Sequence, residues 1–217
     1  MSDAVDFLVI FDLDGTLNNT ELYSVPANLT AMKEFGAPPE VQNRNFITST
    51  FGMTSNEYVK EFMPNFSEDV RKAYLKRVSY LELEIIPKLA KPFKNIPELL
   101  ISLKELNIKT AVCSNASIRY ISAVLKAIGL FDKIDFIQPL VEGCTKKETL
   151  GLLLKSMSPK NAIMVGDRIF DIEAASHNNL KSIGCAYGYN PEETKLADYT
   201  VSDPEEILTI IKSYFNI

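Results

Sequence analysis

The stretch DFLVIFDLDGT, residues 6–16, decides the fold of this 217-residue chain and raises the question of its function. An apolar run leads directly into two carboxylates, Asp12 and Asp14, and then into Gly15. Short continuous apolar runs are typical of parallel strands that are buried on both faces. Asp-Gly is also a common turn pair, so Asp14 and Gly15 could be no more than the turn after that strand. The stretch therefore predicts a central strand that ends either in a plain turn or at a site.

Further apolar runs predict additional strands of the same sheet, at residues 110–113, 136–137, 162–165 and 182–185. Helical patterns lie between and after them, at residues 97–106, 117–128, 146–157, 171–178 and 204–214, with Ser117 and Thr145 as N-caps. Strands that alternate with helices of this length predict βαβ units. The fold class is therefore α/β, with a doubly wound, Rossmann-like parallel sheet.

Residues 18–91 interrupt this alternation. They contain no convincing strand, and an apolar stripe at helical spacing runs through Val70, Tyr74, Val78, Leu81 and Ile85. We therefore expect two domains: an α/β core formed by residues 1–17 and 92–217, and an inserted all-helical domain formed by residues 18–91.

Composition narrows the range of partners. The formal net charge of -5 argues against a nucleic-acid-binding surface, and no apolar run is long enough to predict a membrane span. Three widely spaced cysteines, Cys113, Cys144 and Cys185, are typical of reduced thiols, and no basic region precedes the first apolar run. We expect a cytoplasmic protein, a monomer or homodimer, that binds neither nucleic acid nor membrane.

Polar residues follow several predicted strands, at the sheet edge where open α/β folds bind ligands. They are Asp12 and Asp14, Ser114 and Asn115, Lys146, and Asp167 and Asp171. Each residue alone could be a turn former, a helix cap or a surface charge. Together the topology would bring four carboxylates, a hydroxyl and an amine to one place.

Four carboxylates repel one another unless a cation compensates their charge. A zinc site is not favoured, because His177 is the only histidine and no cysteine cluster exists. Oxygen ligands favour a hard ion, most simply Mg²⁺, which binds one or two carboxylates together with substrate phosphate oxygens. A lysine and a hydroxyl could bind the remaining phosphate oxygens. The set indicates phosphoryl transfer.

At this point the sequence resembles a known family. The motif DLDGTL at residues 12–17, the Ser114-Asn115 pair, Lys146 and GDRIFD at residues 166–171 are similar to the four ordered motifs of the haloacid dehalogenase superfamily. The resemblance spans nearly the whole chain, its helical insert resembles the small cap of that superfamily, and its C-terminal part resembles phosphoglycolate-phosphatase-like members.

The resemblance implies a role for each residue. Asp12 would be the nucleophile that forms an aspartyl-phosphate, and Asp14 would protonate the leaving alcohol and then help activate water. The carboxylates of Asp12 and Asp167 and the backbone carbonyl of Asp14 would hold Mg²⁺, with Asp171 binding or orienting the metal. Ser114, Asn115 and Lys146 would bind the phosphate of a small phosphorylated metabolite.

Asp14 also bears on the reaction type. Dehalogenases of the superfamily lack a carboxylate at this position, since a halide needs no proton, whereas an alcohol does. We therefore expect a Mg²⁺-dependent phosphatase acting on a small phosphomonoester, such as a phosphoglycolate-like compound or a sugar phosphate. Two alternatives stay open: a phosphotransferase such as a sugar phosphomutase, and a non-catalytic phosphate-binding or partner-binding protein.

Several single-residue assignments also stay open. Lys147 adjoins Lys146, and either could meet the phosphate; the family spacing to Glu148 favours Lys146. Asn115 could serve only as a cap. Arg44, in the insert, could meet a substrate carboxylate or be a surface arginine beside core aromatics.

Overall fold

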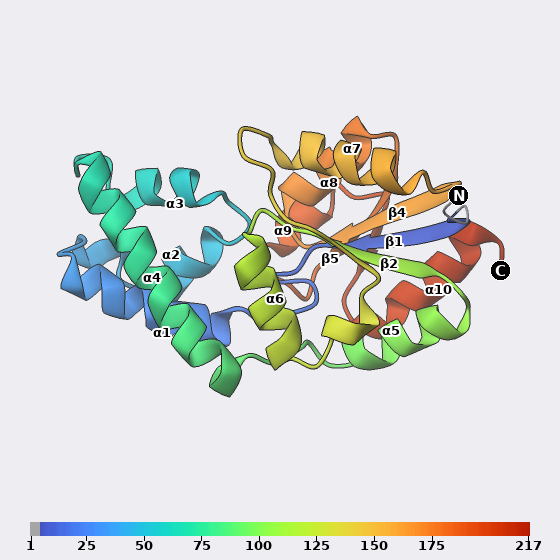
Figure 1. Ribbon diagram of the computed structural model, residues 1–217, viewed down its shortest axis with the longest axis horizontal. Helices are drawn as coiled ribbons and strands as arrows, with labels where there is room; N and C mark the ends of the chain where they lie inside the picture. Colours follow the sequence, from blue (N-terminus) through green and yellow to red (C-terminus); the bar gives the residue numbers. More distant parts are fainter. Residues whose placement is uncertain (1–4) are drawn as a thin grey trace.

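The computed structural model describes residues 5–217. Figure 1 shows two bodies, a sheet flanked by helices and a lobe made of helices alone. The strand arrows run from the chain termini toward the lobe, so the carboxyl ends of the strands face it.

The sheet has six parallel strands in the order β3-β2-β1-β4-β5-β6. The strands are β1 (Phe7–Phe11), β2 (Lys109–Cys113), β3 (Phe136–Gln138), β4 (Asn161–Gly166), β5 (Lys181–Cys185) and β6 (Tyr199–Val201). The predicted doubly wound sheet is confirmed. The edge strand β6 was not predicted, because it is three residues long and two of them are exposed.

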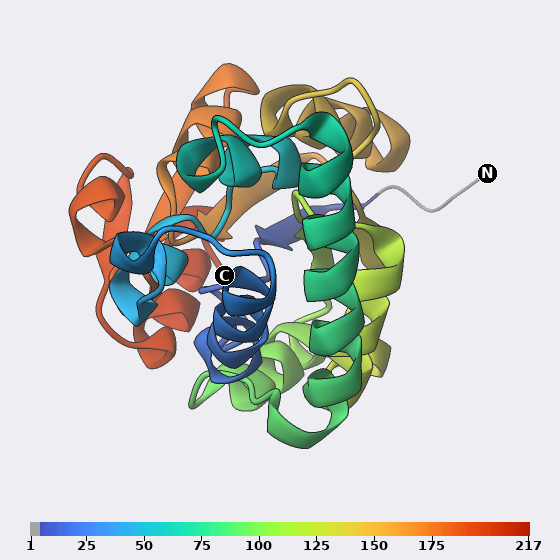
Figure 2. The same cartoon turned by 90° about the vertical axis from the view of Figure 1, so that its left-hand side faces the viewer.

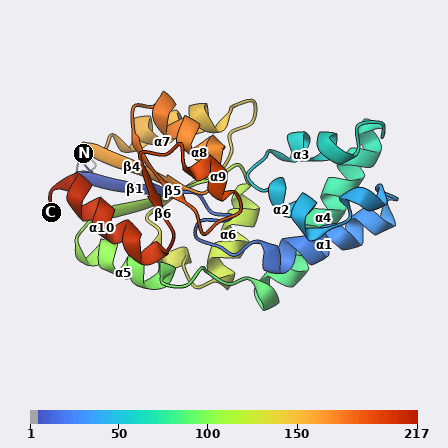
Figure 3. The same ribbon diagram turned by 180° about the vertical axis from the view of Figure 1, so that it is seen from behind.

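Alternate residues of β1 enter two different apolar cores. Val9 and Phe11 pack with α5 (Ile96–Glu105), α6 (Ile118–Ala127) and α10 (Pro204–Phe215) on one face. Leu8 and Ile10 pack with α7 (Lys146–Met157) and α8 (Ile169–His177) on the other. Figure 1 shows these layers, and Figure 3 shows β6 and α10 from behind. This body also contains α9 (Pro191–Thr194) and a 3-10 turn η2 (Phe131–Lys133).

The helical lobe, which we call the cap, has its own apolar core. Met32, Ile47, Phe62, Tyr74 and Val78 are buried together there. Figure 2 views the molecule from the cap side, with the long green helix of residues 68–89 seen along its length. The cap contains α1 (Glu21–Glu34), η1 (Pro39–Val41), α2 (Arg44–Ser49), α3 (Ser55–Phe62) and α4 (Glu68–Leu89). Two neighbouring chain passages join it to the core, where Asn19 N–H donates to the Lys91 carbonyl at 2.9 Å and Phe93 N–H to that of Leu17 at 3.1 Å. These contacts support the domain division after residues 17 and 91, which we propose.

The structure contains the two helix N-caps that the sequence predicts, Ser117 and Thr145. Ser117 caps α6, and Thr145 and Glu148 form a reciprocal capping box at the start of α7. Within residues 5–217, no helix combines the length and the apolar character that a membrane span requires.

Candidate active site

Asp12 is the first residue beyond β1. Its backbone N–H donates to the Val165 carbonyl at 2.8 Å, so the pairing of β1 with β4 continues through it. The residue is only 3% exposed. The central strand pair therefore holds this carboxylate rigidly at the carboxyl edge of the sheet.

Lys146, which is 134 positions further along the sequence, contacts this carboxylate. It is the first residue of α7, and its Nζ lies 2.5 Å from Asp12 Oδ1 and 2.5 Å from Asp171 Oδ1. Lys147 instead pairs with Glu173 on the surface, at 3.0 Å. Of the two lysines left open by the sequence, Lys146 is the one that lies at the carboxylates.

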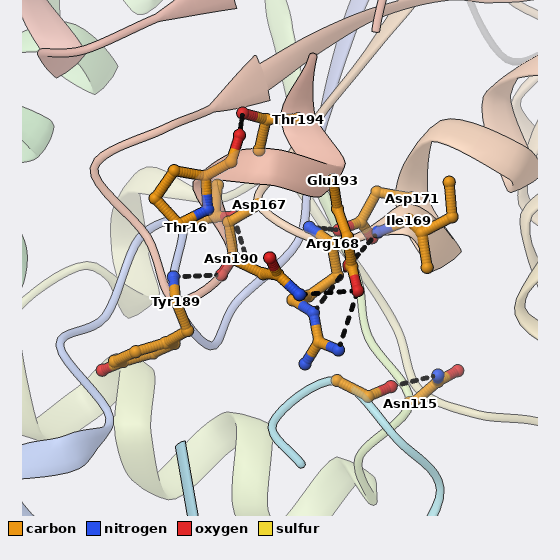
Figure 4. A network of polar contacts seen from close by, with 12 residues as sticks. Thr16, Asn115, Asp167, Arg168, Ile169, Asp171, Tyr189, Asn190, Glu193 and Thr194 are labelled. Carbon is orange, nitrogen blue, oxygen red and sulfur yellow. Dashed lines mark hydrogen bonds and ion pairs between the residues drawn. The ribbon is translucent and has the colours of Figure 1, made fainter. Parts of the chain in front are cut away.

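Three carboxylates meet here. One oxygen from each of Asp12, Asp167 and Asp171 lies within 4.8 Å of the others, and all three residues are buried. Asp167 accepts a hydrogen bond from Tyr189 N–H at 2.9 Å, and Asp171 accepts one from Arg168 N–H at 3.0 Å (Figure 4). The predicted helix at residues 171–178 begins two residues earlier, so Asp171 lies in the first turn of α8 and points back toward Asp167.

Glycines make room for these side chains. A Cβ at Gly15 or Gly188 would collide with the Asp167 carboxylate, and one at Gly166 would collide with Asp171. Gly15 also has a φ of +86°, which L residues rarely adopt. The Asp-Gly turn read from the sequence is thus real, and it opens the space that Asp167 occupies.

The electrostatics of the cluster call for a cation. Burial raises the pKa of Asp12 to about 7 despite the opposing charge of Lys146. Burial, with the charges of Asp12 and Asp171, raises the pKa of Asp167 well above its usual value. Although burial opposes it, the charges of Asp12 and Asp171 raise the pKa of Lys146. One ammonium for three buried carboxylates leaves negative charge uncompensated, and an all-oxygen donor set fits a hard divalent ion.

Asp14 faces away from this cluster. Its Oδ1 accepts hydrogen bonds from Thr20 Oγ1 at 2.6 Å, Tyr120 OH at 3.0 Å and Asn18 Nδ2 at 3.3 Å. Burial raises the pKa of the Asp14 carboxyl. Its side chain lies outside the carboxylate triad, so only its backbone carbonyl is left for the metal role expected from the resemblance.

A cavity of about 250 Å³ lies between the sheet edge and the cap. Asp12, Asp14, Ser114 and Asn115 line its core side. Ser114 is buried, and its Oγ accepts from Ala116 N–H at 3.2 Å. Asn115 Nδ2 donates to the carbonyl of Gly52 in the cap at 2.8 Å, so this side chain joins core and cap (Figure 4).

Arg44 lies outside this arrangement. Its side chain is 61% exposed, forms an ion pair with Glu21 and does not line the cavity. The structure therefore agrees with the interpretation of a surface arginine. His177 is exposed at the end of α8, and Cys113 is buried, with burial raising its pKa to about 12.

Sequence reasoning missed several residues at the cavity. Thr20 lines the cavity, and Asn18 donates to Asp14 beside it. Both lie within three residues of the end of the DLDGTL motif, so their position was a usable signal. Tyr120 and Glu82 reach the cavity from α6 and α4. Nothing in the local sequence around these two sets them apart from other half-buried helix residues.

Comparison with known proteins identifies the family. The family model described as haloacid dehalogenase-like hydrolase matches residues 9–185. The chain belongs to this family. The predicted enzyme class, a phosphoric monoester hydrolase, is confirmed, since the curated relatives include named phosphatases.

Individual relatives carry different substrate names. The chain is 32% identical to a candidate pyrophosphatase, PpaX, of Clostridium perfringens, over 94% of this chain and 96% of the relative. It is 27% identical to a phosphoglycolate phosphatase of Aquifex aeolicus, over 95% of this chain and 97% of the relative. It is 23% identical to an N-acetylmuramic acid 6-phosphate phosphatase of Pseudomonas aeruginosa, over 94% of this chain and 93% of the relative.

Solved structures confirm the fold. A crystal structure described as a predicted phosphoglycolate phosphatase from Haemophilus somnus 129pt superposes with a TM-score of 0.84 at 22% identity, covering 96% of this chain and 99% of that one. A β-phosphoglucomutase from Clostridium difficile superposes with a TM-score of 0.81 at 23% identity, covering 97% of each chain.

Proposed function

We propose that this protein is a Mg²⁺-dependent phosphatase that hydrolyses a small organic phosphomonoester through an aspartyl-phosphate on Asp12. One observation carries the proposal. The Asp12 carboxylate belongs to the carboxylate triad, contacts Lys146 and lines the cavity. Asp14 lines the same cavity, and its carboxyl accepts a hydrogen bond from the Thr20 hydroxyl.

The carboxylates of Asp12, Asp167 and Asp171, with the backbone carbonyl of Asp14, would hold the metal. Bound Mg²⁺ supplies positive charge that neutralises phosphoryl oxygens. Lys146 supplies a second positive charge next to the nucleophile, and Ser114, which lines the cavity, can donate its hydroxyl to the phosphate. Asn115 lines the same wall, but its amide nitrogen already binds Gly52, so we assign it to holding the cap loop beside the phosphate.

In the first half of the reaction an Asp12 carboxylate oxygen attacks phosphorus, and the bond from phosphorus to the alcohol oxygen breaks. Asp14 gives its proton to that departing oxygen. Because burial raises the pKa of Asp14, this carboxyl holds a proton more readily than an exposed one does.

In the second half, a water molecule attacks the phosphorus of the aspartyl-phosphate. Asp14, now ionised, takes a proton from that water, inorganic phosphate leaves, and the Asp12 carboxylate is restored. The hydroxyls of Thr20 and Tyr120 hold Asp14 in the ionised form between the two steps by donating hydrogen bonds to it.

The substrate is a small phosphomonoester, with phosphoglycolate-like compounds and sugar phosphates as candidates. The phosphatase names of the curated relatives support hydrolysis over transfer to a second hydroxyl. The cavity of about 250 Å³ supports a leaving group of few atoms.

The proposal is tested by incubating purified protein with a panel of phosphomonoesters, with Mg²⁺ or with a chelator, and following inorganic phosphate. We expect Mg²⁺-dependent phosphate release. Stopping the reaction in acid should give intact protein heavier by one phosphoryl group. Isomerised sugar phosphate with little free phosphate would instead establish a phosphomutase, and binding of phosphate without turnover of any ester would establish a non-catalytic protein.

A further inference from the structure

The outer half of the cavity is walled by the cap. Its cap side chains include several hydroxyls and the amide of Asn28, apolar side chains such as Leu75 and Val78, and one carboxylate, Glu82 of α4. This wall faces the position that the leaving group must occupy, because Asp12 and Asp14 line the core side of the same cavity.

Glu82 is held in place by a hydrogen-bonded chain. Ser24 Oγ donates to Glu82 Oε1 at 2.6 Å, and Asn28 Nδ2 donates to Ser24 Oγ at 3.1 Å. Asn28 Oδ1 in turn accepts from Tyr58 OH at 2.5 Å and Tyr74 OH at 2.8 Å. Helices α1, α3 and α4 therefore fix the orientation of this carboxylate before any substrate arrives.

The second oxygen of Glu82 is available to a ligand. Among residues 5–217, Ser24 is the one hydrogen-bond donor to this side chain, and it binds Oε1. A half-buried carboxylate with an open oxygen is an acceptor for a hydroxyl or an ammonium group.

The charges of the cavity disfavour a leaving group that carries a negative charge. No lysine, arginine or histidine of the described part of the chain lines it, whereas Asp12, Asp14 and Glu82 do. Arg168, which lies near the cap loop, is already paired with Glu193 at 2.9 Å (Figure 4). At the sheet edge the substrate phosphate would meet Lys146 and the metal site, but a second anionic group in the cap half would meet only Glu82. Like charges brought together at close range disfavour binding.

We propose that Glu82 is a specificity residue that accepts a hydrogen bond from the leaving alcohol, so that the enzyme selects phosphomonoesters whose alcohol carries hydroxyl or ammonium donors and no negative charge. This inference rests on the proposed phosphatase function. It favours polyol, sugar and amino-alcohol phosphates over phosphoglycolate and over pyrophosphate.

Three esters of equal length test the inference. They are 2-hydroxyethyl phosphate, 2-aminoethyl phosphate and phosphoglycolate, which differ only in a terminal hydroxymethyl, aminomethyl or carboxylate group. Phenyl phosphate, which has no terminal donor or charge, reports on the chemistry itself. The assays are run at pH 8, above the pKa of about 7 to which burial raises Glu82, so that this carboxyl is mostly ionised. There we expect kcat/KM for the hydroxyl or the ammonium ester to exceed that for phosphoglycolate by about tenfold or more. Whichever of the two is faster identifies the donor.

Variants at Glu82 connect this preference to the residue. Glu82→Gln should lower the preference over phosphoglycolate about tenfold, with every rate divided by that of the same variant on phenyl phosphate. Glu82→Lys should reverse the preference. Glu84→Gln is the matched control, because Glu84 lies on the exposed side of the same helix and binds Tyr80; it should leave the preference unchanged.

The outcomes separate the two proposals. If phenyl phosphate is hydrolysed but phosphoglycolate is the best of the three esters, and Glu82→Gln leaves the ratios unchanged, the role of Glu82 is wrong and the phosphatase stands. If neither these four esters nor any other ester of the phosphomonoester panel is hydrolysed in Mg²⁺, both proposals fail. Because Glu82→Gln preserves shape, it keeps the test decisive even if Glu82→Lys does not fold.

Discussion

The sheet edge and the cap line one cavity with different chemistry. At the sheet edge, Lys146 lies between Asp12 and Asp171, and backbone pairing fixes Asp12, the proposed nucleophile. In the cap half, hydroxyls, apolar side chains and the single carboxylate of Glu82 form the wall, without a cation among the described residues. The proposed roles follow this difference: charged groups at the strand ends would carry out the reaction, and the packed cap helices would select the alcohol.

The largest expected effect lies at the sheet edge. Asp12→Asn should lower kcat on phenyl phosphate by roughly 10⁴-fold or more, because an amide cannot serve as the same nucleophile. The measurement is phosphate release at saturating substrate, alongside thermal unfolding to show that the variant is folded. Asp6→Asn is the control, since Asp6 is exposed and pairs with Lys160 on the surface. An Asp12→Asn enzyme with near-normal kcat would contradict the mechanism.

Asp14 lines the cavity that the sheet edge and the cap share. A variant at this position should slow proton transfer more than nucleophilic attack. Asp14→Asn should slow hydrolysis of 2-hydroxyethyl phosphate by about 10²–10⁴-fold, because an alkoxide needs a proton to leave. Phenyl phosphate should lose less in the first step, since phenoxide is the better leaving group. Single-turnover rates of the two esters measure this, and equal losses for both would remove the general-acid role of Asp14.

Lys146 and Lys147 give a matched pair within one helix turn. Lys146→Met leaves buried carboxylates without their ammonium, so it should lower kcat/KM about 100-fold and destabilise the protein by about 3 kcal/mol. Lys147→Met loses only a surface pair with Glu173 and should cost less than about 1 kcal/mol. Urea unfolding and phenyl phosphate kinetics check both. Similar losses of kcat/KM and of unfolding free energy for the two variants would show that neither activity nor stability depends specifically on Lys146.

The smallest effect concerns stability in the cap. Burial raises the pKa of Glu82 from its usual 4.5 to about 7, although Ser24 lowers it, and the charge of Asp14 adds to the rise. The folded state therefore binds this proton more tightly than the unfolded state does. The stability that the proton provides is complete below pH 4.5 and is lost as the pH rises toward 7.

Glu82→Gln removes this dependence. The full pKa difference corresponds to roughly 3 kcal/mol, and because Glu82 keeps some exposure to the cavity we expect about 1–2 kcal/mol. The free energy of unfolding of the variant relative to the natural protein should rise by that amount between pH 5 and pH 8. Urea denaturation at the two pH values measures it, with Glu84→Gln as control. A flat difference would mean that Glu82 is ionised freely in the folded state.

The sequence by itself determined the sheet and the identity of the residues at its edge. Asp12, Ser114 and Asp167 each follow an apolar run within one or two residues, and parallel strands bring their carboxyl ends to one side. Local chemistry also fixed the Thr145 cap that starts α7 at Lys146. Neighbouring residues encode these features, so spacing alone reveals them. The short edge strand β6 was not predicted, because three residues, two of them exposed, carry too little pattern.

Only the tertiary structure decided what surrounds the leaving group. Tyr120 reaches Asp14 across 106 positions of sequence, and Ser24 reaches Glu82 across 58. Arg44, a candidate for substrate contact, instead pairs with Glu21 at the surface. Such contacts depend on the angle at which the cap helices pack against each other and against α6. That angle follows from the combined packing of many side chains, which no single stretch of the chain encodes.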